Sequence, residues 1–464
     1  MAREGLEGPP EGGMSIDDMV LGPDGAGDEN MCLERASAKY VCKDDRFRLQ
    51  KKSYDNQYAQ LYYCRLLRMQ PGLTKRIQKE WPGTRVCKIL DLPENQEVAV
   101  VGTIYKEMKL KPSILQEYNK DRGIETLTGH TSFVSDDDSL VLEDESARMA
   151  LKGNAIAAGP LVTGVVAAVR GVSSANGDFQ VKDVLHAGLQ PQQSLPQASE
   201  DKYVALVSGL SMGDEGGETA SVALLVDYLA GLLGGPQEHE QVAKIVRTVI
   251  AGGLLRSVEP ILQAASMAKQ RQQAAALAPI KEMDIALTQL AGAMDVDVMA
   301  GSTDPANHAL PQQPLHSCLL PGAVSFPTLH RVTNPHEFEV DGVSFLGTSG
   351  QNVEDIDRYS TDEDRLRMLE HVLEWGHLAP TAPDTLTAYS FSDKDPFVIE
   401  RAPHVLFAGN QPSFQSKVVE GQDGQKVRLI CVPKFSSTGV LVLVNLRTLN
   451  VQPITFDARL DSSI

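Results

Sequence analysis

The spacing of hydrophobic residues changes at a short segment rich in Pro, Gln and Ser, residues 189–200. Before this segment most apolar runs have the pattern of strands, and after it strand patterns alternate with helical ones. Segments of this composition form linkers between separately packed units. The chain has 464 residues, which is long for one core and sufficient for two. We therefore place a domain boundary at this segment.

The region before the boundary has the pattern of an all-β domain. Five runs rich in β-branched residues are separated by turn signals such as Asn176-Gly177-Asp178, and they cover residues 96–106, 139–145, 148–153, 161–171 and 179–188. Five strands with a long excursion between the first and the second are typical of a small closed barrel. An oligonucleotide/oligosaccharide-binding (OB) barrel over residues 90–190 is the leading candidate.

The region after the boundary has the pattern of an α/β domain. Strand patterns occur at residues 203–210, 244–253, 295–301, 338–350, 404–410 and 428–448, with helical patterns up to Leu233 and at 258–294 and 361–376. Such alternation predicts mainly parallel strands with helices on the faces of the sheet. The closing runs predict additional antiparallel strands. The predicted fold class is thus α/β plus all-β, with the α/β sandwich over residues 201–458.

Two further segments precede the barrel. Residues 1–35 are acidic and rich in Gly and Pro, which predicts a disordered tail. Residues 40–82 are basic, and helical spacing of Tyr58, Tyr62, Leu66, Met69 and Leu73 predicts an amphipathic helical segment. Its basic face could contact nucleic acid or an acidic partner. A helix packed on the next domain with a solvated charged face is the better interpretation, since exposed charges usually contribute little.

Charge and cysteine content argue against a protein that coats nucleic acid and against a secreted protein held together by disulfides. The formal net charge is −18, which argues against coating of nucleic acid by the whole protein but leaves room for one basic patch. The six cysteines include no C-x-x-C pair, and no histidine lies at zinc-ligand spacing to two of them, which predicts reduced thiols. The N-terminus lacks the pattern of a secretory signal, and the apolar run at 220–235 is interrupted by Asp227. An intracellular protein without a membrane span is expected.

Ligands of open α/β sheets bind at the carboxyl ends of the strands, so a catalytic site is expected there. A two-metal hydrolase needs several carboxylates and imidazoles at these positions. Only Asp304 is a good ligand, and one carboxylate cannot hold two divalent ions, so we predict no catalytic residues, no metal and no cofactor. The loops concerned consist of Ser208, Gly209 and Leu210; Gly252 and Gly253; Gly301, Ser302, Thr303 and Asp304; and Gly409, Asn410, Gln411 and Pro412.

Two other functions stay open at this point. A residual metal-dependent 3′ exonuclease or phosphodiesterase would combine Asp304 with Asp355 or Asp357, in the loop after 347–352. A single-strand-binding barrel would use aromatic residues for stacking, and the clearest candidates are Tyr105, Phe133 and Phe179, against the acidic run Asp136-Asp137-Asp138. The histidines His308, His316, His330 and His336 fit no single helix face, which favours hydrogen-bonded loop or core residues.

The order of barrel, linker and α/β domain resembles the small (B) subunits of the replicative DNA polymerases alpha, delta and epsilon. Long stretches carry the resemblance, which is greatest for the delta branch, and they are residues 140–153, 161–171, 307–321, 342–360, 378–386 and 404–414. The similarity runs from about residue 45 to 456. It implies an OB barrel followed by a calcineurin-like phosphoesterase sandwich that lacks its metal ligands.

The resemblance also accounts for the four loops. The D-x-H of these phosphoesterases is replaced by Ser208-Gly209-Leu210, and their G-D by Gly252-Gly253. Their G-N-H-D/E is replaced by Gly301-Ser302-Thr303-Asp304, and their G-H-x-H by 409–412. The family thus implies a degenerate former site.

What the family implies is a scaffold role in the nucleus, in DNA replication and repair. The implied partners are the cysteine-rich C-terminal module of the DNA polymerase delta catalytic subunit and a third subunit of that polymerase, with polymerase zeta sharing the same pair. Contact with DNA would be weak or indirect. The resemblance assigns no individual contact residues.

Overall fold

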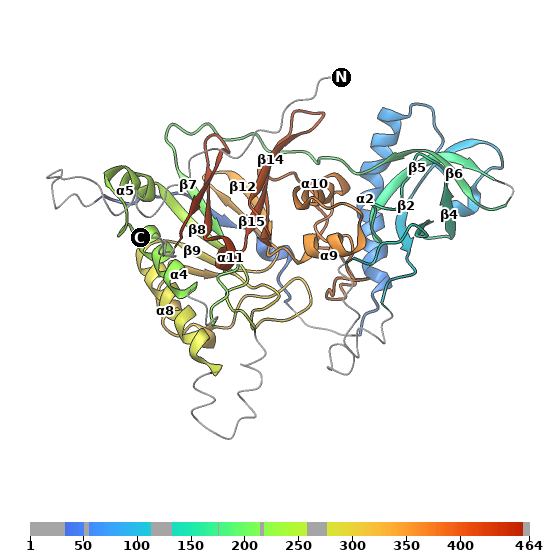
Figure 1. The fold of residues 1–464 in the computed structure, drawn as a ribbon. Helices are drawn as coiled ribbons and strands as arrows, with labels where there is room; N and C mark the ends of the chain where they lie inside the picture. Colours follow the sequence, from blue (N-terminus) through green and yellow to red (C-terminus); the bar gives the residue numbers. More distant parts are fainter. Residues whose placement is uncertain are drawn as a thin grey trace, which may run out of the picture.

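The structure, a computed structural model, describes residues 33–50, 55–112, 132–174, 176–213, 218–257 and 276–457. A five-stranded barrel lies beside a larger unit built on two six-stranded sheets, and a long helix, α2 (Ala59–Glu80), lies between them (Figure 1). The expected acidic tail at 1–35 lies outside the described residues as far as residue 32. No helix in the described segments is long and apolar enough to cross a membrane.

The five predicted strands close into a barrel, in the order β2-β3-β4-β6-β5. Burial alternates along β3 and β4, whereas β2 and β5 are buried on both faces because α2 covers them, and residues such as Val100, Leu142 and Phe179 fill the interior. The fourth strand begins five residues later than expected, because Gly164 adopts a positive φ of 93° in a turn just before it. The strands are β2 (Glu97–Glu107), β3 (Ser139–Glu143), β4 (Arg148–Lys152), β5 (Val166–Ser173) and β6 (Phe179–Leu185).

One sheet of the larger unit has the order β1-β11-β12-β13-β15-β14. Strands β12, β13 and β15 are parallel, and the strands on either side of them are antiparallel. Its bounds are β1 (Tyr40–Cys42), β11 (His336–Val340), β12 (Val343–Thr348), β13 (Val405–Gln411), β15 (Lys426–Pro433) and β14 (Gln415–Glu420).

The other sheet has the order β10-β9-β8-β7-β16-β17. Its first four strands are parallel, and the closing strands β16 and β17 are antiparallel. The antiparallel pairing predicted for the run 428–448 is thus right for β16 but wrong for β15, which pairs parallel with β13 in the first sheet. Its bounds are β10 (Leu329–Arg331), β9 (Val296–Met299), β8 (Ile245–Ala251), β7 (Tyr203–Val207), β16 (Val440–Asn445) and β17 (Val451–Thr455).

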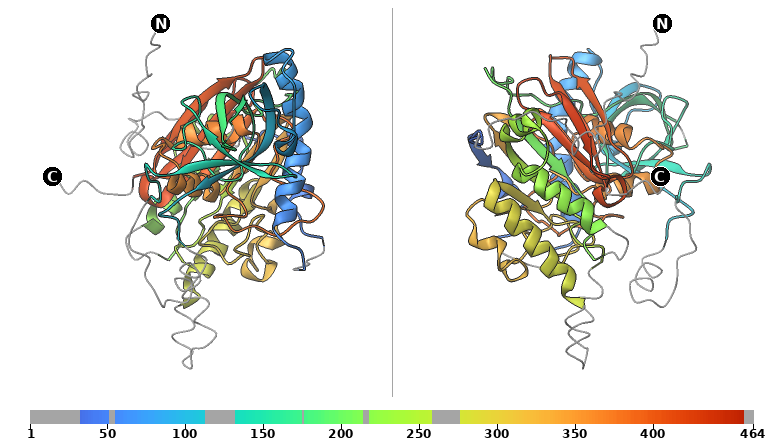
Figure 2. Two further views of the ribbon diagram at one scale, coloured as in Figure 1. Left: turned by 90° about the vertical axis from the view of Figure 1, so that its right-hand side faces the viewer. Right: turned by 60° about the vertical axis from the view of Figure 1, so that its left-hand side comes forward.

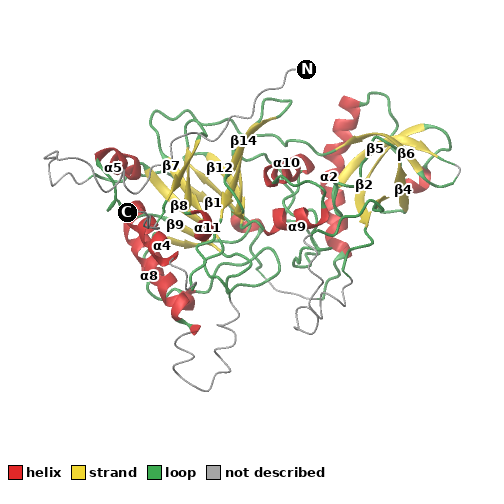
Figure 3. Cartoon of the chain, in the orientation of Figure 1, coloured by secondary structure: helices red, strands yellow, loops and turns green. Residues whose placement is uncertain are grey.

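The two sheets stack face to face and helices cover their outer faces, so the strands lie inside (Figure 3). Leu206, Val249, Phe345 and Phe407 belong to the core between the sheets. Helices α4 (Glu218–Ala230) and α8 (Ala278–Ala293) lie side by side on the second sheet (Figure 2), with α5 (Pro236–Ala243) beside α4. Helices α9 (Gln351–Tyr359) and α10 (Arg365–Trp375) cover the first sheet. The short helix α11 (Phe435–Thr438) links β15 to β16.

The structure corrects several expected boundaries. The run 338–350 is a hairpin and not one strand, because Asp341 and Gly342 take positive φ angles and reverse the chain. Helix α9 and strand β14 were not expected. Helix α8 begins at residue 278, and the residues 258–275 of the predicted helix lie outside the described residues.

In the predicted helical segment 40–82 the α-helix begins at residue 59, after a single 3₁₀ turn at Asp44–Arg46. Residues 40–42 form the edge strand β1, which pairs with β11. Val41 and Cys42 are exposed, whereas Tyr40 packs against Phe338 at a ring separation of 6.0 Å. The segment is therefore divided between the two units, with a strand in one and a helix against the other.

Helix α2 packs along the barrel (Figure 2, left), with Leu66, Met69, Leu73 and Ile77 buried on strands β2 and β5. The interior of the barrel is continuous with the layer of α9 and α10 in one hydrophobic cluster. The barrel and the sandwich therefore share buried apolar surface across their boundary.

Candidate functional site

The loops that follow β7, β8, β9, β12 and β13 meet at one edge of the sandwich, as parallel strands require. The backbone N–H of Gly209 donates to the carbonyl of Gly252 at 2.9 Å, and that of Ser211 donates to Gly253 at 2.9 Å. The first two loops therefore continue the pairing of their strands. The structure thus brings together the loops after β7 and β8 that the sequence singled out.

Glycines let these loops approach one another so closely that no side chain fits between them. A Cβ on Gly253, whose φ is +70°, would lie 2.4 Å from Oδ1 of Asn410 and 2.9 Å from Cα of Gly209. A Cβ on Gly252 would lie 2.8 Å from Cα of Gly301. The backbones themselves thus fill the space into which ligand side chains would project.

The side chain of Asn410 joins three of the loops. Its Nδ2 donates to the carbonyls of Ala251 at 3.1 Å and Ser349 at 2.9 Å, and its backbone N–H donates to Oγ of Ser208 at 2.8 Å. Each of these bonds satisfies a group at the end of a different strand. A neutral amide therefore occupies the centre of the loop cluster.

Asp304 is buried, and backbone amides surround its carboxylate. Its Oδ2 accepts from the N–H groups of Gly301 at 2.7 Å and Gly253 at 2.8 Å, and its Oδ1 accepts from Leu255 at 3.0 Å. Burial raises the pKa of Asp304 to about 6, although these N–H donors act in the opposite direction. The carboxylate fastens the second loop to the third, and both of its oxygens are engaged.

Side-chain amides form a second buried network beside Asp304, which no sequence pattern predicted. Gln312 donates to the carbonyl of Gly301 at 3.0 Å and accepts from Asn334 at 2.8 Å and Gln351 at 2.9 Å. These residues come from distant segments and share no spacing, so no motif could have identified them. Their groups are neutral, and the network positions loops without holding charge.

The acids proposed for a residual exonuclease do not join Asp304. Asp355 and Asp357 lie in α9 rather than in a loop, and this expectation was wrong because α9 begins directly after β12. Asp355 accepts from Oγ1 of Thr385 at 2.6 Å, and Asp357 forms an ion pair with Arg365 at 2.6 Å. Within the described residues no three metal-ligating side chains converge at these loops.

Three of the four clustered histidines have polar partners in the fold, and these contacts are compatible with loop and core positions. Nδ1 of His336 lies 2.8 Å from Asp44, Nε2 of His330 lies 3.4 Å from Asp295, and Nδ1 of His316 accepts from the backbone of Cys318.

The aromatic candidates for nucleic-acid stacking are in contact with other side chains. Phe179 is fully buried in the barrel, and Phe133 stacks on Tyr359 with ring centroids 5.3 Å apart. The guanidinium of Arg148 lies over the ring of Tyr105, 5.5 Å from its centroid. These three rings therefore do not form an open stacking surface.

Helix α2 carries a buried cation at the junction of the barrel with the sandwich. The side chain of Arg65 is fully buried, and its Nε lies 2.8 Å from Asp395. Its other nitrogens donate to the carbonyls of Gly164 at 2.9 Å and Pro380 at 2.7 Å, and His377 lies 2.9 Å from Asp395. The interpretation of α2 as a packed helix is thus confirmed, although Arg65 is not part of a solvated face.

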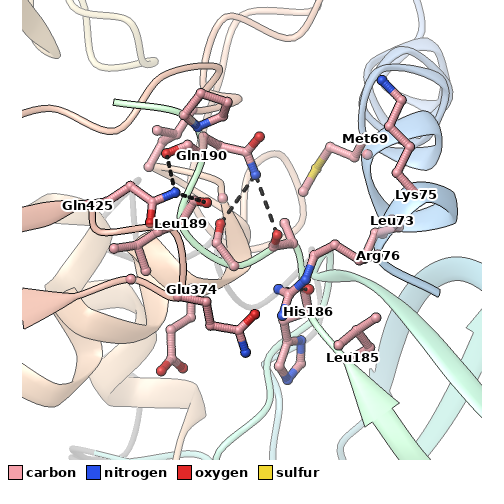
Figure 4. A pocket seen from close by; sticks show the side chains of 18 of the residues that line it. Met69, Leu73, Lys75, Arg76, Leu185, His186, Leu189, Gln190, Glu374 and Gln425 are labelled. Carbon is pink, nitrogen blue, oxygen red and sulfur yellow. Dashed lines mark hydrogen bonds between the residues drawn. The ribbon is translucent and has the colours of Figure 1, made fainter. Parts of the chain in front are cut away.

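A cleft of about 740 Å³ opens along α2 between the barrel and the sandwich (Figure 4). Met69, Leu73 and Arg76 line it from the side of α2, and Arg76 donates to the carbonyl of His186 at 2.7 Å. Gln425, in the loop after β14, donates to the linker at Leu189. The lining has four basic and four acidic side chains, which are Arg68, Lys75, Arg76 and Lys79 and Glu374, Glu400, Glu420 and Asp423. The acidic side chains balance the basic ones, so the cleft lacks the excess of positive charge that phosphate binding needs.

Two family models match the chain on either side of the linker. The model of the OB-fold domain of the DNA polymerase delta subunit matches residues 57–184, which contain α2 and the barrel. The model of the DNA polymerase alpha/epsilon B subunit matches residues 204–416. The predicted OB barrel is thus confirmed.

Relatives are similar over nearly the whole chain. The DNA polymerase delta small subunit of Arabidopsis thaliana is 44% identical over 94% of this chain and 99% of its own length. The chain belongs to the family of DNA polymerase delta small subunits. The small subunit of Saccharomyces cerevisiae is 32% identical over 93% of this chain and 97% of its own length, and DNA polymerase delta subunit 2 of Drosophila melanogaster is 36% identical over 91% and 98%.

Proposed function

We propose that the chain is a non-catalytic accessory subunit of the DNA polymerase delta complex. It would act in the nucleus, in DNA replication and repair. The family assignment supports the place in this complex. The contact between the strand-end loops supports the absence of catalysis, since metal-assisted hydrolysis needs a complete set of charged ligands around an open site.

The α/β sandwich fits a calcineurin-like phosphoesterase fold that has lost its metal ligands. The loops after β7, β8, β9 and β13 correspond to the four ligand-bearing segments of that fold. Their glycine contacts, the amide of Asn410 and the engaged carboxylate of Asp304 are the observation that carries this proposal. The proposed division of the chain is a segment 40–82, a barrel domain 90–190 and a sandwich domain 201–458.

In the proposed scaffold, the barrel and the sandwich are two binding units held in a fixed relation. The buried Arg65–Asp395–His377 cluster and the shared apolar core support such rigidity. The proposed partners are the cysteine-rich C-terminal module of the catalytic subunit and a third subunit, with polymerase zeta as a second user of the pair. Direct contact with DNA would be weak, because the three barrel aromatics are already covered.

The first test is co-expression of the full chain with the cysteine-rich module of the catalytic subunit, followed by size exclusion at high salt. A stoichiometric complex that survives the salt is expected, since stable interfaces between subunits are large and comparatively apolar. A folded chain that elutes alone would contradict the docking role.

A second test addresses catalysis. The purified chain is incubated with a 3′-labelled single strand and Mn²⁺, in parallel with the Asp304→Asn variant. No excision above the buffer control is expected from either protein. Metal-dependent excision by the wild type that is lost in Asp304→Asn would overturn the proposal and favour the exonuclease.

A further inference from the structure

The edge strand β1 brings a cysteine to a buried histidine from a distant part of the chain. Cys42, the last residue of β1, pairs with Phe338 of β11, and His336 is two residues earlier on β11. Residues two apart on a strand point to the same face, and His336 and Phe338 both point into the space between the sheets. Cys42 therefore lies at the rim of that space, where it is exposed to solvent.

Asp44 follows β1 and completes a group of three ligand-type side chains. Sγ of Cys42, a carboxylate oxygen of Asp44 and a ring nitrogen of His336 all lie within 4.8 Å of one another. In a tetrahedral zinc site with bonds of about 2.0–2.3 Å, the ligand atoms are roughly 3.3–3.7 Å apart. The hydrogen bond between Nδ1 of His336 and Asp44, which is 2.8 Å long, would give way to two metal bonds. Within the described residues no other group of three or more such side chains meets this distance.

The histidine is oriented in the way that metal-binding histidines are. Nδ1 of His336 faces Asp44 at 2.8 Å, and the opposite nitrogen, Nε2, lies 3.4 Å from the carboxylate of Asp297 on β9. Asp297 is held in turn by Arg247 at 2.5 Å. A carboxylate on the far nitrogen of a histidine fixes the ring orientation and strengthens the metal bond.

The carboxylate of Asp44 is held in place by the backbone. It accepts from the N–H groups of Glu337 at 2.8 Å and Thr333 at 3.3 Å, and its side chain is fully buried. Two of the three ligands are therefore fixed and buried, and the third is on the surface. This arrangement leaves a path for an ion from the side of Cys42.

We propose that Cys42, Asp44 and His336 bind one Zn²⁺ ion, each through one ligand atom, with water in the fourth position. A thiolate, an imidazole and a carboxylate form a donor set that zinc accepts and that magnesium and calcium do not. The ion would join the N-terminal strand to both sheets, since Asp297 belongs to the other sheet. Binding releases the thiol proton of Cys42 and any proton shared by His336 and Asp44.

The test is a Co²⁺ titration of the full-length chain after removal of metals with a chelator. The wild type is expected to bind one equivalent, with a thiolate-to-cobalt charge-transfer band in the near ultraviolet and the visible bands of a tetrahedral ion. Added Zn²⁺ should abolish these bands. Cys42→Ser should lose the charge-transfer band, and the control Cys318→Ser, which removes another exposed cysteine, should keep it.

Two results would overturn the proposal. One is the absence of a charge-transfer band in the wild-type protein. The three side chains would then only be hydrogen-bonded to one another. The other is a band of equal intensity in Cys42→Ser, which would place the thiolate elsewhere. If Cys42→Ser does not fold, X-ray absorption on the zinc-loaded wild type decides, because one sulfur ligand per zinc is expected and none would overturn the site.

Discussion

Two buried aspartates show how differently the strand-end loops and the junction at α2 are built. Asp304 at the loops accepts hydrogen bonds from three backbone N–H groups. Asp395 at the junction faces the guanidinium of Arg65 and the ring of His377. Both side chains are shielded from solvent, yet burial raises the pKa of Asp304 to about 6. Burial would also raise that of Asp395, but His377 and Arg65 hold the pKa of Asp395 well below its ordinary value.

The different partners of Asp304 and Asp395 show where in this protein opposite charges are paired in the interior. At the strand ends, where an enzyme would gather ligands, one carboxylate organises the backbone through hydrogen bonds from three N–H groups. At the junction, a complete ion pair with added hydrogen bonds fixes the barrel against the sandwich. A protein that positions partners benefits from the second arrangement and has no need of an open first one.

The largest effect is expected at the junction. Replacing Arg65 with Met leaves Asp395 buried without its cation and removes donors from Gly164 and Pro380. Loss of one partner of a buried pair costs about 3–5 kcal/mol of unfolding free energy. Urea unfolding of the two full-length proteins measures it.

The matched control for the junction is Arg68→Met, one turn of α2 away. Arg68 pairs with Glu400 at 2.6 Å, and both side chains are more than half exposed. A change below about 1 kcal/mol is expected for such a pair. Equal effects of the two substitutions would show that burial of Arg65 does not matter to the junction.

The close contact between the strand-end loops can be tested by adding one methyl group, as a glycine-to-alanine substitution. In Gly253→Ala the new Cβ would meet Asn410 and Gly209, and a positive φ adds backbone strain. We expect a loss of about 2–4 kcal/mol from overpacking and strain together. Gly83→Ala is the control, because Gly83 has a similar φ of +81° and nothing lies within 4 Å of its Cβ position. A Gly253→Ala chain as stable as the control would mean that the loops can separate.

The sequence predicted features that depend on neighbours along the chain. The barrel strands, the antiparallel strand β16 and the position of the strand-end loops follow from local periodicity and the adjacent turns. The pairing of β1 with β11 joins segments that are far apart in the sequence, and no local pattern encodes it. Cys42 and His336 are equally far apart in the sequence, so they do not form a metal-binding motif that could be recognised by its spacing.

Burial of Arg65 could have been found from the sequence. It lies four residues after Leu61 and four before Met69, so helical spacing places it on the buried face. The sequence interpretation treated all basic residues of the segment as one solvated face, and so it missed the buried position of Arg65. Helix α9 was missed for another reason, since nine residues give too short a pattern to distinguish from a loop.

The opposite pKa shifts of the two aspartates predict opposite responses to pH. Asp304 binds its proton more tightly when folded, so its contribution to stability falls as pH rises from about 4 to about 6 and is constant above. The full fall is about 1–3 kcal/mol for a shift of roughly two units. Asp395 contributes fully above a pH of about 4 and loses its contribution as pH falls further.

Urea unfolding of wild type and Asp304→Asn at several pH values from about 4 to about 7 checks this. The difference between the two unfolding free energies should fall with rising pH, since only the wild type carries the group. A difference independent of pH would mean that the folded protein does not raise the pKa of Asp304.

The smallest effect is expected for an exposed ion pair at the rim of the cleft, far more open to solvent than either buried aspartate. Lys79 on α2 and Asp423 in the loop between β14 and β15 lie 3.3 Å apart, with side chains 60% and 71% exposed. A double-mutant cycle of Lys79→Ala and Asp423→Ala should give a coupling below about 1 kcal/mol, because water and salt screen such pairs. The same cycle repeated in the complex with the catalytic module tests the cleft as a binding surface. A coupling unchanged on binding would place the interface elsewhere, whereas a marked increase would show that the partner excludes water from this rim.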